Sequence, residues 1–283
     1  MKHVLTVLFL IVCIAFTLPS HAGEGDSCAS SGVSGSNQEP TDLSIIGFDS
    51  RVRVDYPQYS PFSPVGLVLS IWDDKSKLCT GTLISRDIVM TAGHCIMDDD
   101  GILSQEIYFA PSFYADPNYI YLPFDYGIAV HAISWNNDDD DIAFFKIDKE
   151  LGENSGYFNV ILSDKTILEW FFSVYGPVWG YNPGYPADKD GEMWYSFCSA
   201  KEWFPYYNKI GCDCDTFEGS SGSPFLIDID GFFYVAGILV QQVGPTYATN
   251  RFGFNYFLFS DKAVNLMQSI PEDYYYQAME WLQ

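Results

Sequence analysis

The chain has 283 residues, enough for one large or two small domains with a substantial core, which excludes a small scaffold held together only by disulfides. Hydrophobic residues make up 48% and charged residues 18%, a composition typical of a folded globular protein and not of a disordered one. The formal net charge of -23 argues against nucleic-acid binding, because so acidic a surface repels phosphate groups.

The first 22 residues have the pattern of a secretory signal peptide. A basic start at Lys2 precedes an apolar run of 15 residues over 4–18, and Ser20-His21-Ala22 has the small residues that signal peptidase accepts. That run is short for a membrane span. We therefore expect cleavage after Ala22 and a secreted protein, extracellular or periplasmic, with no membrane association after cleavage.

Residues 23–44 are rich in Gly and Ser and contain almost no large apolar side chains, which is typical of a flexible arm or a propeptide. Globular sequence begins near Ile45, so the expected organisation is a signal peptide over 1–22, an arm or propeptide over 23–44 and one domain over 45–283. A zymogen would need a second cut between Cys28 and Asp49, near Ile45. The alternative is an arm that is never removed.

From residue 45 onward, short apolar runs between turn signals predict many strands, and few helices are indicated. Residues 228–231, Asp-Ile-Asp-Gly, predict a hairpin turn between two of these strands. Helical spacing appears only near the end, over 261–267 and again from Pro271 to Trp281-Leu282. The pattern predicts an all-β sandwich or barrel, with strands over 65–71, 79–85, 88–91, 106–110, 142–147, 193–198, 224–227, 232–240 and 252–259.

Six cysteines follow the signal peptide, an even number that favours three disulfides in an exported protein. They are Cys28, Cys79, Cys95, Cys198, Cys212 and Cys214. Clustered cysteines can instead bind zinc, but Cys212-Asp213-Cys214 lacks the two-residue spacing of a zinc knuckle and no second pair accompanies it. We therefore expect neither a metal nor another cofactor.

Only two histidines, His94 and His131, follow the signal peptide. His131 lies in an apolar stretch, which is typical of a packed histidine or one at the rim of a core. His94 follows an apolar strand in the sequence Thr-Ala-Gly-His-Cys, in a turn that can present its ring. If the protein uses imidazole catalysis, His94 is the candidate.

A candidate nucleophile lies further along the chain, at Ser221. Gly219 and Gly222 flank a tight turn there, so the backbone amides of Gly219 and Ser221 can converge on one point as an oxyanion hole. A serine hydroxyl needs a neighbouring base, and the base needs an orienting acid. Asp141 opens a buried strand and is the candidate acid, with Asp125 as its rival.

Three stretches in this order, 79–95 (CTGTLISRDIVMTAGHC), 141–147 (DIAFFKI) and 215–224 (DTFEGSSGSP), resemble the chymotrypsin-fold serine peptidases, specifically the bacterial glutamyl endopeptidase branch. Residues 49–57 and 180–189 are similar to two further segments of that branch. The resemblance spans roughly 45–270. It implies an all-β fold of two six-stranded β-barrels with the active site between them, and a secreted serine endopeptidase that forms an acyl-enzyme on protein or peptide substrates. We expect a monomer.

Carried over to this sequence, the resemblance implies that Ser221 attacks the carbonyl and that His94 acts first as base and then as acid. Asp141 would orient His94, and the amides of Gly219 and Ser221 would bind the oxyanion. The resembling fold also brings Cys79 and Cys95 together as a disulfide.

The four other cysteines leave their pairing open. A bridge between Cys212 and Cys214 would close too small a loop for relaxed geometry. We favour Cys198 with Cys214, which leaves Cys28 with Cys212.

Asp215, Thr216 and Leu239 are the residues expected at the primary specificity pocket. Asp215 lies six residues before Ser221, where the trypsin branch has the acid at its pocket floor; alternatively, its carboxylate turns away into backbone hydrogen bonds. Leu239 stands where the glutamyl endopeptidases have a histidine that binds glutamate, and Glu218 adds negative charge. We expect basic or neutral residues before the scissile bond in preference to Glu or Asp.

Two other function classes fit the sequence less well. A catalytically inactive homologue acting as a secreted binding module usually lacks a triad residue, whereas all three are present here. An esterase of the α/β-hydrolase kind needs Gly-x-Ser-x-Gly and the chain order Ser, Asp, His. The order here is His, Asp, Ser, which excludes that reading.

Overall fold

The structure is a computed structural model that describes residues 45–282 except 47, 116–118, 138–139, 163–169, 171, 205–208, 244–247, 250–254 and 257–263. All of them belong to one compact unit over 40–283. The expected signal peptide, the arm over 23–44, Cys28 and most of the predicted strand 252–259 lie outside the described residues.

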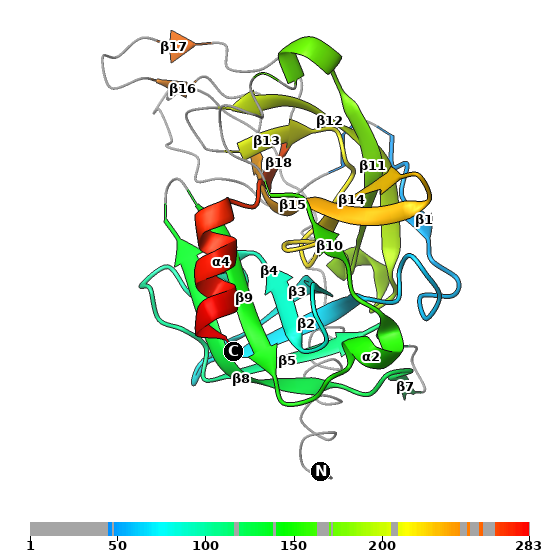
Figure 1. Cartoon of the computed structure of the whole chain (residues 1–283), viewed down its shortest axis with the longest axis vertical. Helices are drawn as coiled ribbons and strands as arrows, with labels where there is room; N and C mark the ends of the chain where they lie inside the picture. The colour runs from blue at the N-terminus through cyan, green and yellow to red at the C-terminus, as the bar shows by residue number, and fades with distance from the viewer. Residues whose placement is uncertain are drawn as a thin grey trace, which may run out of the picture. The chain divides into compact units, whose positions relative to one another are not determined.

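The described elements are almost all strands (Figure 1). In chain order they are β1 (Val52–Arg53), β2 (Val65–Ile71), β3 (Ser76–Leu83), β4 (Ile88–Thr91), η1 (Gly93–Cys95), β5 (Glu106–Pro111), β6 (Tyr114–Ala115), β7 (Ile120–Tyr121), β8 (Gly127–Asn136), β9 (Asp141–Ile147), α2 (Gly152–Ser155), β10 (Asn159–Val160), β11 (Val178–Gly184), η2 (Ala187–Lys189), β12 (Trp194–Phe204), β13 (Lys209–Cys212), β14 (Pro224–Ile229), β15 (Phe232–Val243), β16 (Ala248–Thr249), β17 (Asn255–Tyr256), β18 (Val264–Gln268) and α4 (Glu272–Trp281).

The first barrel is closed and antiparallel, with strand order β2-β3-β4-β9-β8-β5. Its strands are rich in β-branched and aromatic residues, which favour a pleated and buried surface. The largest side chains with almost no exposure include Phe109, Phe144, Phe145 and Met90, so the barrel interior is a packed aromatic and aliphatic core.

The second barrel has strand order β12-β11-β14-β15-β18-β13, and a further β12–β13 pairing closes the ring. Its core is a cluster of buried side chains, and several more apolar residues pack against it. The cluster consists of Cys198, Ala200, Ile210, Cys212, Cys214, Phe225, Leu239 and Met267. The double six-stranded β-barrel implied by the resemblance is thereby confirmed.

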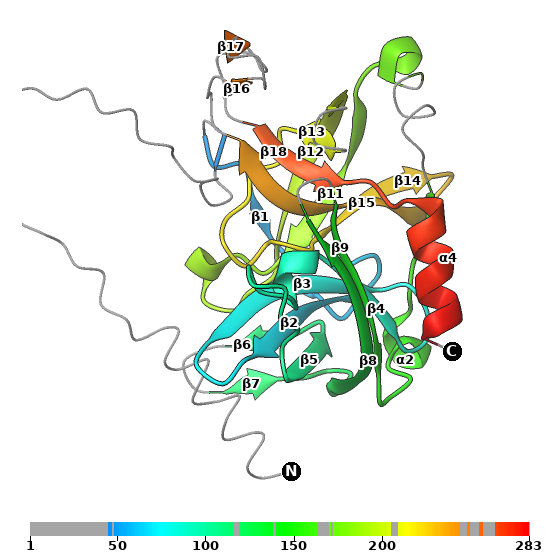
Figure 2. The same ribbon diagram turned by 90° about the vertical axis from the view of Figure 1, so that its left-hand side faces the viewer.

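The C-terminal helix α4 lies against the first barrel (Figures 1 and 2). Tyr274 stacks on Trp135 with ring centroids 4.4 Å apart, and Tyr275 meets Phe144 edge-on at 6.4 Å. The helix begins directly after Pro271, as the sequence predicts. No helix in the described part of the chain is long and apolar enough to cross a membrane.

The predicted helix over 261–267 is wrong, because Val264–Gln268 is strand β18. This strand is hydrogen-bonded to β13 on one side and β15 on the other, and without it the second barrel would stay open. Leu266 and Met267 are both fully buried, since one face of β18 packs in the barrel core while the other is also covered. Burial on both faces removes the alternation that identifies a strand.

Candidate active site

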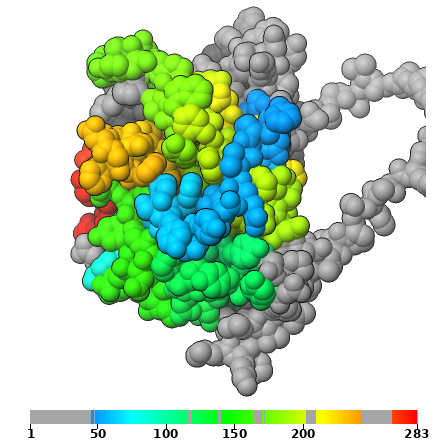
Figure 3. All heavy atoms as spheres, turned by 90° about the vertical axis from the view of Figure 1, so that its right-hand side faces the viewer, coloured from blue at the N-terminus to red at the C-terminus, as the bar shows by residue number. Residues whose placement is uncertain are grey.

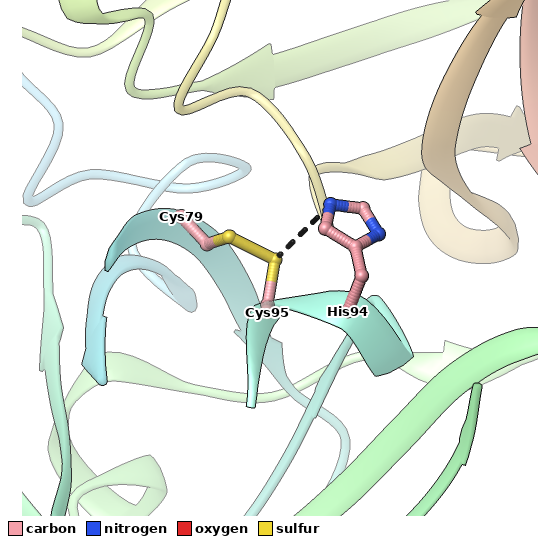
Figure 4. A group of neighbouring side chains, drawn as sticks. All are labelled: Cys79, His94 and Cys95. Atoms are coloured by element: carbon pink, nitrogen blue, oxygen red, sulfur yellow. Dashed lines mark hydrogen bonds between the residues drawn. A yellow bond between two sulfur atoms is a disulfide. The ribbon is translucent and has the colours of Figure 1, made fainter. Parts of the chain in front are cut away.

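His94 is held on a short 3-10 turn, η1, directly after β4 of the first barrel. Cys79 on β3 and Cys95 on η1 form a disulfide with an S–S distance of 2.03 Å, so the turn that carries His94 is tied covalently to the neighbouring strand (Figure 4). The His94 side chain is 19% exposed. The imidazole is therefore accessible, but its backbone is fixed.

Asp141 opens β9 and holds His94 through both carboxylate oxygens. Its Oδ2 lies 2.7 Å from Nδ1 of His94, and its Oδ1 accepts the backbone N–H of His94 at 2.9 Å. Burial by itself would raise the pKa of Asp141, but the charge and hydrogen bonds of His94, with a smaller contribution from the charge of Lys209, hold that pKa below its usual range. An ionised Asp141 keeps Nδ1 protonated and leaves Nε2 as the acceptor.

The two rival residues lie elsewhere. The Asp125 side chain is 59% exposed and forms an ion pair with Lys149 at 2.7 Å. His131 is exposed on β8, with its ring edge-on to Trp281 at 5.8 Å. Of these candidates, the structure brings only Asp141 to His94.

Ser221 lies in a turn before β14 that only glycines can form. Gly219 and Gly222 have φ values of +86° and +83°, in the left-handed region that other residues rarely adopt. A Cβ at Gly219 would lie 2.4 Å from the carbonyl oxygen of Tyr185, and one at Gly222 would lie 2.2 Å from that of Thr80. Both glycines are required by conformation and by space.

The turn leaves two backbone donors free. Among the described residues, the amides of Ser220, Gly222 and Ser223 all donate to backbone carbonyls, whereas those of Gly219 and Ser221 do not. These are the two amides that the sequence assigns to an oxyanion hole. The turn therefore has the donors that such a site needs.

Ser221 and His94 lie beside the same sulfur atom. Sγ of Cys95 is 3.6 Å from the carbonyl oxygen of Ser221 and 3.9 Å from Nε2 of His94, the contact dashed in Figure 4. In the described part of the chain no hydrogen bond joins the Ser221 hydroxyl to Nε2; such bonds often tighten only when substrate is bound. Cys79, His94 and Cys95 also place one donor atom each within 4.8 Å of one another, but the disulfide leaves neither sulfur as a thiolate for a metal.

Thr80 of β3 joins the nucleophile turn to the first barrel. Its backbone N–H donates to the carbonyl oxygen of Ser221 at 2.9 Å, and its hydroxyl donates to that of Gly219 at 2.9 Å. The same hydroxyl accepts the buried N–H of Tyr185 at 2.9 Å. One residue next to the Cys79–Cys95 disulfide thus sets the position of the serine turn relative to His94.

The Asp215 carboxylate is occupied by the chain itself. Oδ1 accepts the N–H of Ile46 at 2.7 Å, and Oδ2 accepts the N–H and the hydroxyl of Ser50 at 2.8 and 2.5 Å. Figure 3 shows this first described segment, in blue, running over residues of both barrels. Of the two alternatives for Asp215, the structure shows the one in which the carboxylate turns away into hydrogen bonds with the chain, where it anchors the start of the domain.

The two other residues expected at the pocket are also buried. Leu239 is fully buried in the core cluster of the second barrel and pairs with Met267 across β15 and β18. Thr216 is 1% exposed, and its hydroxyl has no hydrogen-bond partner among the described residues. Thr216 is thus the one of the three with a polar group left to satisfy.

The remaining cysteines partly match the prediction. Cys198 and Cys214 form a disulfide, as favoured. Cys212 is a free thiol with no exposed surface, and burial raises its pKa to about 12. The expected Cys28–Cys212 bridge is not present, because Cys212 packs as an apolar side chain in the barrel core.

Known proteins that are similar to this chain have a trypsin-like sequence or fold. Residues 57–169 match the family described as Trypsin, a range that contains His94 and Asp141 but not Ser221. A solved Glu endopeptidase in complex with MPD superposes with a TM-score of 0.62 at 19% identity, covering 84% of this chain and 98% of the other. This chain has the chymotrypsin fold. It resembles the glutamyl endopeptidase branch of the trypsin-like proteins.

Further relatives agree with this assignment of the trypsin-like fold. The protease Anisep from Arthrobacter nicotinovorans has a TM-score of 0.56 at 18% identity, covering 78% of this chain and 97% of that one. A glutamyl endopeptidase of Bacillus licheniformis is 26% identical over 203 residues, which are 64% of this chain and 54% of that protein. The chain thus spans about half the length of the curated relative that it matches.

Thr80, Arg51 and Lys209 form interactions at or near the site that the sequence does not predict. Arg51 is almost fully buried; it forms an ion pair with Asp49 of its own segment at 2.9 Å, and its ion pair with Asp188 at 2.6 Å ties that segment to the second barrel. The side-chain hydrogen bond of Arg51 holds the pKa of Asp49 well below its usual range, although burial opposes this. The similarity of residues 49–57 and 180–189 to family segments was a signal for this contact. No local pattern marks Thr80 or Lys209.

Replacing Thr80 by Val should lower the free energy of unfolding by about 1–3 kcal/mol, because the buried amide of Tyr185 and the carbonyl of Gly219 lose their partner. Thr80→Ser keeps the hydroxyl and should stay close to the wild type. Denaturant unfolding of the three proteins measures the difference. Equal stability of Thr80→Val and Thr80→Ser would show that the hydroxyl does not hold the turn.

Proposed function

We propose that the chain is a secreted serine endopeptidase that hydrolyses peptide bonds through Ser221, His94 and Asp141. The observation that carries the proposal is the double hold of Asp141 on His94, through Nδ1 at 2.7 Å and the backbone amide at 2.9 Å. This arrangement leaves Nε2 as a base on the side of Ser221. The trypsin-like fold and the relatives named as endopeptidases support the same activity.

The chemistry follows from these positions. Nε2 of His94 takes the proton of the Ser221 hydroxyl while its oxygen attacks the substrate carbonyl, and the amides of Gly219 and Ser221 bind the resulting oxyanion. His94 then gives the proton to the leaving amine, and the C–N bond breaks to leave an acyl-enzyme. Water, deprotonated by His94, hydrolyses this ester and restores the serine. Asp141 stabilises the imidazolium in both halves of the cycle.

Secretion and maturation belong to the same proposal. Two disulfides among the described residues fit an oxidising compartment, as the apolar run over 4–18 predicts. Ile46 and Ser50 are tied to Asp215, so the domain is anchored from this point on, downstream of the polar stretch over 23–44. We propose that this stretch is a propeptide and that the protein acts as a monomer on peptide substrates.

Replacing Ser221 by Ala should lower kcat for a peptide substrate by about 10⁴-fold or more, since the triad residues act as a unit. The exposed Ser76→Ala variant is the control and should keep wild-type activity. Active-site titration with an acylating serine reagent, followed by identification of the labelled peptide, checks which serine reacts. Near wild-type activity of Ser221→Ala would contradict the proposal, and a wild type that is never labelled would favour an inactive binding module.

N-terminal sequencing of the active secreted protein should give a start between Cys28 and Asp49, near Ile45. The anchored residues from Ile46 onward would then stay with the domain. Active protein that begins at Gly23 would show that no second cut is needed. Purification in the presence of a serine-directed inhibitor controls for trimming during handling.

The protein should cleave peptide bonds that follow a basic or neutral residue in preference to bonds that follow Glu or Asp. Among the described residues expected at the pocket, Leu239 offers no cation and Thr216 offers only a hydroxyl, while the chain carries a net charge of -23. Peptides that differ only in Glu, Gln or Lys at this position, compared at low and high salt, separate the pocket from long-range repulsion. Dominant cleavage after Glu at both salt concentrations would contradict the expectation.

A further inference from the structure

A lysine is buried on the outer face of the second barrel. Ile210 on β13 and Met267 on β18 are register partners whose side chains lie in the barrel core. Successive side chains of a strand point to opposite faces, so Lys209 and its partner Gln268 point away from that core. Both are nevertheless buried, at 3% and 0% exposure. Another part of the protein must cover this face.

The covering part is the start of β9 in the first barrel. Oε1 of Gln268 accepts the backbone N–H of Asp141 at 3.2 Å. Directly opposite residues of an antiparallel pair present their side chains on the same face and at the same level, so Lys209 emerges beside Gln268 toward Asp141. The charge of Lys209 accordingly contributes to the lowered pKa of Asp141.

We propose that Lys209 is a positioning residue that acts through Asp141. Together with His94, its buried ammonium favours the negatively charged form of Asp141 and its position beside His94, and it thereby shifts the acidic limit of activity to lower pH. The inference rests on the proposed peptidase function, since it concerns how the base of that site is controlled. It goes further by assigning to the second barrel a charge that Asp141 of the first barrel needs.

The other groups around the pair do not supply this charge. The element η1 contributes His94, which is the residue whose protonation the proposal concerns. On the exposed side, Lys77 donates to the backbone oxygen of His94. The neighbouring Asp140 carboxylate accepts the Tyr274 hydroxyl of α4.

The remaining neighbours are neutral or paired with each other. Ser134 of β8, whose hydroxyl donates to the Gly93 oxygen, and Gln268 and Asn265 of β18 carry no charge. Lys201 of β12 is paired with Asp213. In the described part of the chain, Lys209 is therefore the buried cation whose charge reaches Asp141.

The sign of the effect follows from charge alone. Protonation of the His94–Asp141 pair adds positive charge next to a buried ammonium, and the repulsion opposes it. Without Lys209 the pair takes up its proton at a higher pH. Because the mechanism needs unprotonated His94, the acidic limb of the pH profile then moves upward.

The test compares the pH dependence of kcat/KM for one peptide substrate in four full-length secreted proteins: wild type, Lys209→Met, Lys209→Arg and Lys149→Met. Lys149→Met removes a surface lysine paired with Asp125 and is the control. We expect the acidic limb to rise by about one pH unit in Lys209→Met, with an approximately tenfold loss of kcat/KM on the acid side. The limb should stay in place in Lys209→Arg and Lys149→Met.

A second readout does not depend on activity. In the Ser221→Ala background, proton NMR follows the titration of the His94 ring, with His131→Asn to assign the two ring signals of the mature chain. The His94 titration should move upward on adding Lys209→Met and stay in place on adding Lys209→Arg. Lys209→Gln substitutes if Lys209→Met does not fold, as judged by circular dichroism and thermal unfolding.

The outcomes separate the two proposals. An inactive wild type would overturn the proposed function, while the NMR titration would still test Lys209. An active wild type whose acidic limb and His94 titration are the same in folded Lys209→Met or Lys209→Gln would overturn the role of Lys209 alone. Gln268→Leu removes the Asp141 amide partner but keeps the charge. It should lower kcat without moving the limb, and a limb that moved equally would show that packing, not charge, is responsible.

Discussion

The buried carboxylate of Asp141 is the group on which the arrangement of the two barrels depends. Taking a charge out of water is costly unless opposite charges and hydrogen-bond donors surround it. The ring and amide of His94 supply donors to the carboxylate from the first barrel, and the charge of Lys209 reaches it from the second. Gln268 of the second barrel accepts the backbone N–H of the same residue. Because Asp141 interacts with both barrels, a movement of either one would disturb its environment. The contacts that stabilise the charge of Asp141 are therefore also the contacts that position it for His94.

The turn that carries Ser221 is shaped by its own residues but positioned by the other barrel. The turn around Ser221 is held by its own glycines in a conformation with few alternatives, but its location comes from Thr80, a residue of the other barrel. Thr80 follows Cys79, whose disulfide partner Cys95 follows His94. The base His94 and the nucleophile Ser221 are thus both positioned by the same strand, β3. The geometry of the reacting atoms is consequently less sensitive to small movements of the barrels.

Local sequence was sufficient where a role depends on neighbours along the chain. The turn residues around His94 and Ser221, the buried strand after Asp141 and the resemblance they carry predicted the two barrels and the candidate triad. Sequence failed where partners are distant. The strand β18 has the apolar spacing of a helix because it is covered on both faces, and Asp215 has the sequence position of a pocket acid although its partners lie more than 160 residues earlier. Lys209 looks like any surface lysine until the covering strand is known.

The position of β18 in the chain has a consequence for when the site can exist. Residues 264–268 both close the second barrel and supply the partner of the Asp141 amide, and they follow His94, Asp141 and Ser221 in the chain. A chain folded only as far as Ser221 therefore has all three candidate residues, but it has neither the closed second barrel nor the Gln268 contact at Asp141. The order of the strands thus makes completion of the proposed site depend on a segment that comes after every one of its reacting groups.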